Sequence, residues 1–249
     1  YSRRDAAFAK QLTNALEQSG RDVWIDWQDI PRAADWLNEI FDGIERAETV
    51  VNVVSRNSLI SEVCNQEIAY ARKHGKRIIP LIHENITPDI EAEINAHWGN
   101  QLWGSTGIAN WEAVRHLNWI FFPKSENGDV AQDVFDREYA ALIQAIETDL
   151  THVRLHTRYL VQSLDWDNNA QNPSYLLYGD ELTAAEQWLV GWDLDKQRRI
   201  DSGEQQLKQP EPTVLQRQFV AASRQAENER AARLMQLETS RKMSEEAAQ

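Results

Sequence analysis

Short, almost continuously apolar runs separated by helical segments constrain the fold of this chain more than any other feature. Residues 49–54 read TVVNVV and residues 78–82 read IIPLI. Neither run alternates apolar with polar side chains, so each predicts a strand in a sheet that is covered on both faces. Helical patterns lie between such runs. Repeated units of strand and helix with short connections predict a doubly wound parallel sheet, which places the chain in the α/β class.

The same reasoning predicts further strands on either side of these two. Residues 23–25 form a short apolar run, and residues 117–122 form another after an irregular segment over 83–116. The chain opens on loop-like residues, so the strand expected before Ser2 is mostly missing from it. A closing helix is predicted over 130–149.

Helix boundaries follow from capping residues. Asp5 can cap a helix whose apolar residues recur every fourth position, and Gly20 is well placed to end it. Ser61 is placed to begin a second helix, which ends at Gly75. Both helices are expected to pack on the sheet.

The alternation of strand and helix stops near residue 150. Residues 150–165, 180–195 and 213–240 all carry helical patterns. We therefore predict an α/β domain over 1–149, a small helical connector over 150–212 and a projecting helix over 213–249.

Composition excludes several classes of partner. The formal net charge of −13 argues against a nucleic acid or an anionic membrane, since both need a basic face. The chain holds one cysteine, so an internal disulfide is impossible and a reducing cytoplasm is expected. No apolar run approaches the roughly 18–20 residues that span a bilayer. The first residue is Tyr1 rather than Met, which indicates a fragment.

One carboxylate stands out at the predicted edge of the sheet. Ligands of open parallel sheets sit beyond the carboxyl ends of the strands. Side chains of a helix lean back toward its start, so Glu67 on the helix from Ser61 can reach that edge. Cys64, Ile68 and Ala71 share a stripe that should face the sheet, which leaves Glu67 free to face a cleft. A lone glutamate on a helix is usually a solvated surface residue, and spacing alone favours that reading.

Residues 1–122, and less clearly those to 149, resemble a bacterial-type TIR (Toll/interleukin-1 receptor) domain. The order and spacing of several short pieces carry the resemblance, and these pieces are residues 1–5, 23–31, 55–58, 61–67 and 75–81. The resemblance implies a flavodoxin-like, doubly wound sheet of five parallel strands, followed here by an all-α extension.

The resemblance also implies an activity. Many TIR domains cleave NAD⁺ at the nicotinamide–ribose bond, and their catalytic glutamate aligns with Glu67. NAD⁺ is then a substrate and no cofactor is implied. A carboxylate beside the ribose stabilises the positive charge that develops as nicotinamide leaves. Tyr1 and Trp27 are candidates to stack on a ring, and Arg3 or Arg4 to pair with the pyrophosphate.

Two further positions complete the substrate-binding set that the resemblance implies, Ser55 and Val63. Several active relatives carry Trp where this chain has Val63, four residues before the glutamate. Stacking on nicotinamide from this position is lost, so activity would be weak or would rely on Trp27.

A self-association loop and a fused partner are implied as well. The loop residues are Asp26, Asp29, Ile30 and Pro31, which lead into the so-called BB loop. Residues 151–224 resemble a helical connector that follows bacterial TIR domains and leads to sensor modules. We therefore expect self-assembly in prokaryotic defence signalling. The rival reading is a non-catalytic interaction scaffold, and a nuclease or cyclic-nucleotide synthetase would need a basic groove that the chain does not show.

Structural readings compete with the functional ones. Trp27 also reads as a loop anchor, and Arg3 and Arg4 as partners of Asp5 or Asp29. Cys64 reads as a small apolar filler. His152 and His156 are spaced for one helix face, but no third ligand is evident, so no metal site is expected.

Overall fold

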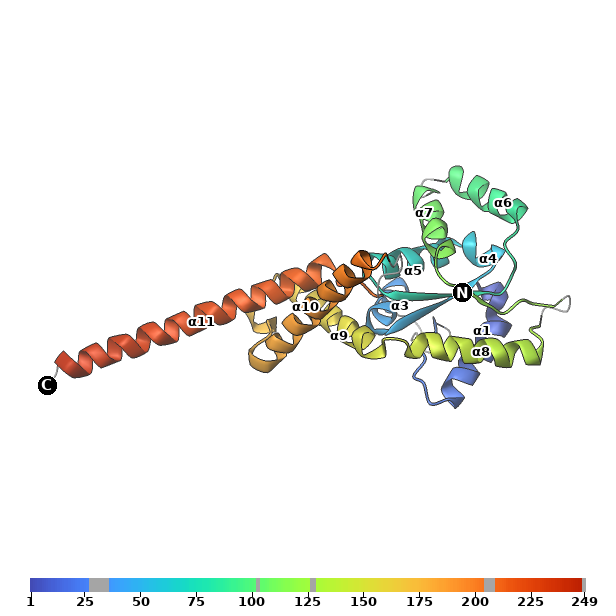
Figure 1. Cartoon of the computed structure of the whole chain (residues 1–249). Coiled ribbons are helices and arrows are strands. Elements are labelled where there is room, and N and C mark those ends of the chain that lie inside the picture. Colours follow the sequence, from blue (N-terminus) through green and yellow to red (C-terminus); the bar gives the residue numbers. More distant parts are fainter. Residues whose placement is uncertain (27–35, 102–103, 126–128, 204–208, 248–249) are drawn as a thin grey trace. The chain divides into compact units, whose positions relative to one another are not determined.

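The computed structural model describes all residues except 27–35, 102–103, 126–128, 204–208 and 248–249 (Figure 1). The chain divides into two compact units, Tyr1–Val153 and Arg154–Gln249, which we describe one at a time.

The first unit is built on a parallel sheet. Its strands are β1 (Thr49–Val54), β2 (Arg77–Ile82) and β3 (Ile120–Phe121), in the order β1-β2-β3. Thr49 pairs with Arg77, and the register continues to Val54 opposite Ile82. Helices flank this sheet, so the α/β class is confirmed, with three strands among the described residues where five were predicted.

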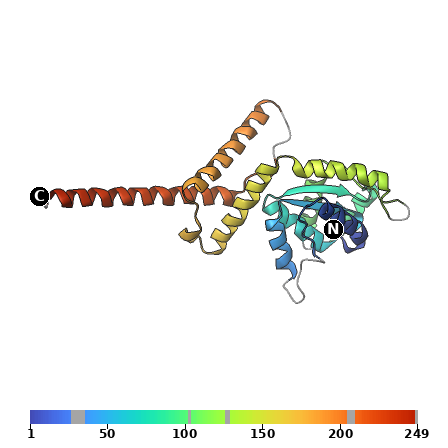
Figure 2. The same ribbon diagram turned by 90° about the horizontal axis from the view of Figure 1, so that it is seen from below.

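Successive side chains of β1 and β2 point to opposite faces, and each face has its own core. Val53 and Leu81 pack with α1 (Ala6–Gln18) and α8 (Gln132–Glu147). Val54 and Ile82 pack with α4 (Arg56–Leu59), α5 (Glu62–Lys73), α6 (Pro88–Gly99) and α7 (Gly104–Arg115). Beside them, α3 (Trp36–Arg46) packs on α5 through Ile40. Figure 1 draws α8 on one side of the strands and α5 and α7 on the other, and Figure 2 gives the same ribbon seen from below.

The strand predicted over 23–25 is not formed. A parallel strand needs a hydrogen-bonded neighbour, and within the described residues no strand pairs with this segment. Trp24 instead lies over Gly43 of α3, where an added Cβ would come within 2.7 Å of its indole ring. The strand predicted over 117–122 is present but shortened to Ile120–Phe121.

The irregular segment predicted over 83–116 is wrong, because α6 and α7 occupy most of it. Thr87 caps α6 by accepting a hydrogen bond from the Ile90 nitrogen, and Pro88 takes the first turn, where its missing N–H costs nothing. Gly107 of α7 lies against Trp98, whose indole would be 2.2 Å from an added Cβ. Gly107 therefore allows α7 to pack closely on Trp98 of α6.

The helix boundaries predicted from caps are largely confirmed. Ser61 caps α5 by accepting from the Cys64 nitrogen, and Gly75 follows its end with a φ of 60°. Gly20, with a φ of 79°, follows the end of α1. At the other end of α1, Asp5 occupies the cap position without a side-chain capping bond.

The second unit is helical, as predicted. It contains most of α9 (Leu150–Asn168), a 3-10 turn (Pro173–Tyr175), α10 (Gly179–Asp201) and α11 (Val214–Ala247). Tyr159, Trp188 and Phe219 are in its core. Every side chain of α11 from Asn228 to Glu246 is exposed. Within the described part of the chain, no helix has the length and apolar character needed to cross a membrane.

Candidate active site

Helix α5 buries one stripe of side chains and leaves Glu67 partly exposed. Cys64, Ile68 and Ala71 are buried, as the predicted stripe requires. The side chain of Glu67 is 23% exposed, so it is neither sealed in the core nor fully solvated. A half-buried carboxylate of this kind can meet a ligand without first losing its structural contacts.

Tyr1 links Glu67 to Asp26. The Tyr1 main-chain nitrogen lies 3.8 Å from Glu67 Oε2. The Tyr1 phenol donates a 2.6 Å hydrogen bond to Asp26 Oδ1. Three segments that are distant in sequence therefore place two carboxylates and one aromatic ring together.

The electrostatics of this group disfavour negative charge on Glu67. Burial raises the pKa of Glu67 above its usual value, and the charge of Asp26 acts in the same direction. Burial and the hydrogen bond to Asp26 raise the pKa of the Tyr1 phenol, which stays protonated. A carboxylate whose negative charge is poorly stabilised by its surroundings is chemically suited to stabilise a cation that forms next to it.

The two arginines of the first turn point to solvent. Arg3 and Arg4 are exposed in the 3-10 turn Arg3–Asp5. Arg4 Nη1 donates to Asn57 Oδ1 at 3.1 Å. Asp5 is buried and accepts from the Ser55 hydroxyl at 2.6 Å, and no ion pair joins it to either arginine in the described structure. The pairing of the arginines with Asp5 that we considered is therefore not formed.

Ser55 is fully buried and holds two elements together. Its hydroxyl donates to Asp5, and it also forms a capping box with Ser58 at the start of α4. Val63, one turn before Glu67, is partly buried. Substrate contacts by Ser55 and Val63 remain predictions.

Part of the predicted site lies outside the described residues. Trp27, Asp29, Ile30 and Pro31 belong to the segment 27–35. Of the predicted interaction loop, the structure therefore describes Asp26 alone.

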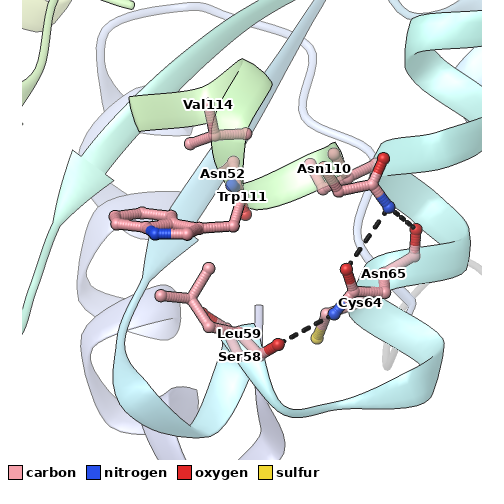
Figure 3. A pocket seen from close by; sticks show the side chains of 9 residues that line it. Asn52, Ser58, Leu59, Cys64, Asn65, Asn110, Trp111 and Val114 are labelled. Carbon is pink, nitrogen blue, oxygen red and sulfur yellow. Dashed lines mark hydrogen bonds between the residues drawn. The ribbon is translucent and has the colours of Figure 1, made fainter. Parts of the chain in front are cut away.

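Two cavities border α5, and Glu67 lines neither. The larger, about 210 Å³, lies between the first two turns of α5, Trp98 of α6 and the start of α7, with Glu62 and Gln66 in its wall. The smaller, about 10 Å³, lies between β1, α4, α5 and α7 (Figure 3). Among the described residues, no three His, Cys, Asp or Glu side chains are grouped as a metal site.

Sequence reasoning missed the role of Asp5 and of two asparagines. The sequence predicts Asp5 as a helix cap, but its bond to Ser55 spans 50 residues and leaves no local signal. Asn110 of α7 donates to the Asn65 main-chain oxygen at 2.9 Å and accepts from Arg72 Nη1 at 2.7 Å. These contacts fix α7 on the helix that carries Glu67.

The model of the TIR domain family matches residues 1–129. The chain belongs to the TIR domain family. The match covers the sheet through β3 and ends just before α8. None of the curated proteins compared with the chain matches it. TIR domains include enzymes that cleave NAD⁺ as well as scaffolds that bind other TIR domains, so membership alone does not choose between these roles.

Proposed function

We propose that this TIR domain is an NAD⁺ glycohydrolase with Glu67 as its catalytic residue. The observation that carries the proposal is the position of Glu67, a half-buried carboxylate next to Tyr1 and Asp26 at 3.8 Å from the Tyr1 nitrogen. Because burial and Asp26 disfavour its charge, this carboxylate gains most from a positive charge that appears beside it.

The reaction breaks the bond between the nicotinamide nitrogen and C1′ of the ribose. Nicotinamide leaves with the electron pair and becomes neutral, so it needs no general acid, and the ribose passes through an oxocarbenium-like state. Glu67 stabilises that charge and holds the ribose hydroxyls. Water then adds to C1′ and loses a proton, which gives ADP-ribose, or an adenine nitrogen of the same molecule adds and gives a cyclic ADP-ribose.

Other residues bind the substrate in this proposal. Tyr1 and Trp27 stack on rings, and Ser55 and Val63 border the site. Arg3 and Arg4 pair with the pyrophosphate, and their exposure next to Tyr1 leaves their charges available. NAD⁺ is the substrate, so no cofactor is required.

Self-assembly switches the enzyme on in this proposal. The loop that begins at Asp26 and includes Asp29, Ile30 and Pro31 contacts a neighbouring copy and completes the cleft. A sensor module fused to the helical connector triggers assembly in the cytoplasm of a prokaryote, as part of defence signalling.

Incubation of concentrated protein with NAD⁺ tests the activity. We expect release of nicotinamide, detected by chromatography, and its loss in Glu67→Gln. The matched control is Glu62→Gln, an exposed glutamate on the same helix that should leave release unchanged. Equal release from Glu67→Gln and the parent protein would reject the assignment of Glu67.

A non-catalytic scaffold is the second candidate, and Val63 favours it. A valine one turn before Glu67 cannot stack on nicotinamide as an indole can. The scaffold reading predicts no nicotinamide release in a sample whose assembly is demonstrated by light scattering. It also predicts that Glu67→Gln leaves binding to other TIR domains intact.

A further inference from the structure

The middle of β1 contains one polar side chain in an apolar run. Asn52 is 6% exposed and lies opposite Pro80 in the register of the sheet. It shares the face of β1 that carries Val50 and Val54, toward α5 and α7. A valine or isoleucine would suit this buried strand position, so the presence of a polar amide there calls for a physical explanation.

Within the described residues, neither the oxygen nor the nitrogen of the Asn52 amide makes a side-chain hydrogen bond. These two atoms are not among the fully enclosed polar atoms that lack a partner, which agrees with their facing a cavity. An unsatisfied buried amide costs about 1–3 kcal/mol, and native structures rarely leave one without a protein or water partner. The neighbouring asparagines do have protein partners: Asn65 donates to the Leu59 oxygen at 2.9 Å, and Asn110 donates to the Asn65 main-chain oxygen at 2.9 Å.

Asn52 lines the small cavity between β1, α4, α5 and α7 (Figure 3). Its volume of about 10 Å³ is close to the space that one water needs. Ser58, Cys64 and Asn65 contribute further polar atoms to its wall, and Trp111 and Val114 contribute apolar ones. A water there would need two to four polar partners.

The wall supplies such partners. The Asn52 amide offers one acceptor and two donors, and Asn65 Oδ1 has a lone pair beyond the long 3.3 Å bond from Asn110. The Cys64 thiol is a weak donor, and burial raises its pKa, so it keeps its proton. Anions are disfavoured here because none of the lining residues is a cation.

We propose that this cavity binds one water molecule, which bridges Asn52 of the sheet to the polar side chains of α5. The water would satisfy the one amide that the strand buries. It would also extend the chain of hydrogen bonds from Arg72 through Asn110 and Asn65 into the sheet. The helix that carries Glu67 would thus be tied to β1 by a polar link as well as by apolar packing. This inference does not depend on the proposed function.

A crystal structure of the whole chain, at a resolution that shows ordered waters, tests the proposal. We expect one density peak within hydrogen-bonding distance of the Asn52 amide and of an α5 side chain. Asn52→Val should lose this peak although the cavity is at least as large. Asn52→Ser, which keeps a donor and an acceptor, should retain it.

Three results would overturn the proposal. The parent structure could show Asn52 turned onto a protein partner, or a cavity without a peak. The peak could also persist in Asn52→Val, which would mean that Asn52 does not hold the water. Since the parent structure decides by itself, the proposal stays testable even if one variant fails to fold.

Discussion

The hydroxyl of Tyr1 donates a 2.6 Å hydrogen bond to the carboxylate of Asp26, and the same residue places its main-chain nitrogen 3.8 Å from Glu67. Tyr1 is thus the physical link between the helix that carries the candidate catalytic residue and the start of the predicted interaction loop. A change at either carboxylate should be felt at the other through charge as well as through contact.

Asp26→Asn should move the acid limb of the pH–activity profile to lower pH. The charge of Asp26 helps to raise the pKa of Glu67, so its removal lowers that pKa and keeps Glu67 ionised in more acidic solution. Asparagine can still accept from the Tyr1 hydroxyl. The measurement is nicotinamide release against pH, with Asp22→Asn, an exposed acid nearby, as the control. An acid limb that stays in place would show that Asp26 does not act on Glu67.

Glu67 should also reduce stability at neutral pH, whatever its role in catalysis. Burial raises the pKa of Glu67 in the folded chain above its usual value, so the folded state binds its proton more tightly than the unfolded state. The stability that comes from this tighter proton binding is therefore fully present below the pKa of Glu67 in the unfolded state. It is lost as the pH rises through the pKa of Glu67 in the folded state. The difference in melting temperature, Glu67→Gln minus parent, should grow more positive as the pH rises from about 4 to 7. Glu62→Gln is the control, and a flat difference for Glu67→Gln would contradict the burial argument.

Ser55→Ala should destabilise the first unit more than Ser61→Ala does. Both serines cap a helix, and losing a cap costs about 1 kcal/mol. Ser55 also donates to the buried Asp5 carboxylate, and leaving such a charge without its donor adds roughly 1–3 kcal/mol. Urea unfolding measures both variants. Equal losses would show that the Asp5–Ser55 bond adds nothing beyond capping.

The sequence predicted the fold where local patterns decide it. The apolar runs at 49–54 and 78–82 form the two long strands, and Ser61 begins α5. The predictions from the sequence were wrong where a contact between distant residues decides the local structure. Residues 83–116 are predicted to be irregular, but α6 and α7 form there, with Gly104 and Gly107 packed closely against Trp98.

In the candidate site, too, local patterns could be predicted from the sequence and contacts between distant residues could not. The lean of helical side chains predicts Glu67 at the sheet edge, and the structure places it beside Tyr1. The bonds from Tyr1 to Asp26 and from Ser55 to Asp5 join residues 25 and 50 positions apart, so no local pattern could reveal them. A buried amide that lacks a hydrogen-bond partner among the described residues, such as that of Asn52, can be recognised only when the packing around it is known.

Gly107→Ala and Gly99→Ala should change stability in opposite directions. A Cβ at Gly107 would lie 2.2 Å from the Trp98 ring, which is buried and bonded to the Leu59 oxygen, so the ring cannot move aside cheaply. Overpacking of this kind costs about 1–3 kcal/mol. A Cβ at Gly99 meets nothing within 4 Å, so alanine there should stabilise by about 0.5–1 kcal/mol. Urea unfolding gives both values, and a neutral Gly107→Ala would show that Trp98 is more loosely packed than the structure indicates.

Tyr159→Phe should stabilise the second unit. The Tyr159 hydroxyl is buried in the helical core and has no hydrogen-bond partner in the described structure. Removing an unsatisfied buried hydroxyl while keeping the ring should recover about 1 kcal/mol. Tyr178→Phe is the matched control. The Tyr178 hydroxyl is exposed and donates to the Pro173 oxygen at 2.7 Å, so its removal should leave the stability unchanged or slightly lower it. Thermal unfolding should therefore show a higher melting temperature for Tyr159→Phe and an equal or lower one for Tyr178→Phe. A lower melting temperature for Tyr159→Phe would mean that its hydroxyl has a partner in solution, such as an ordered water.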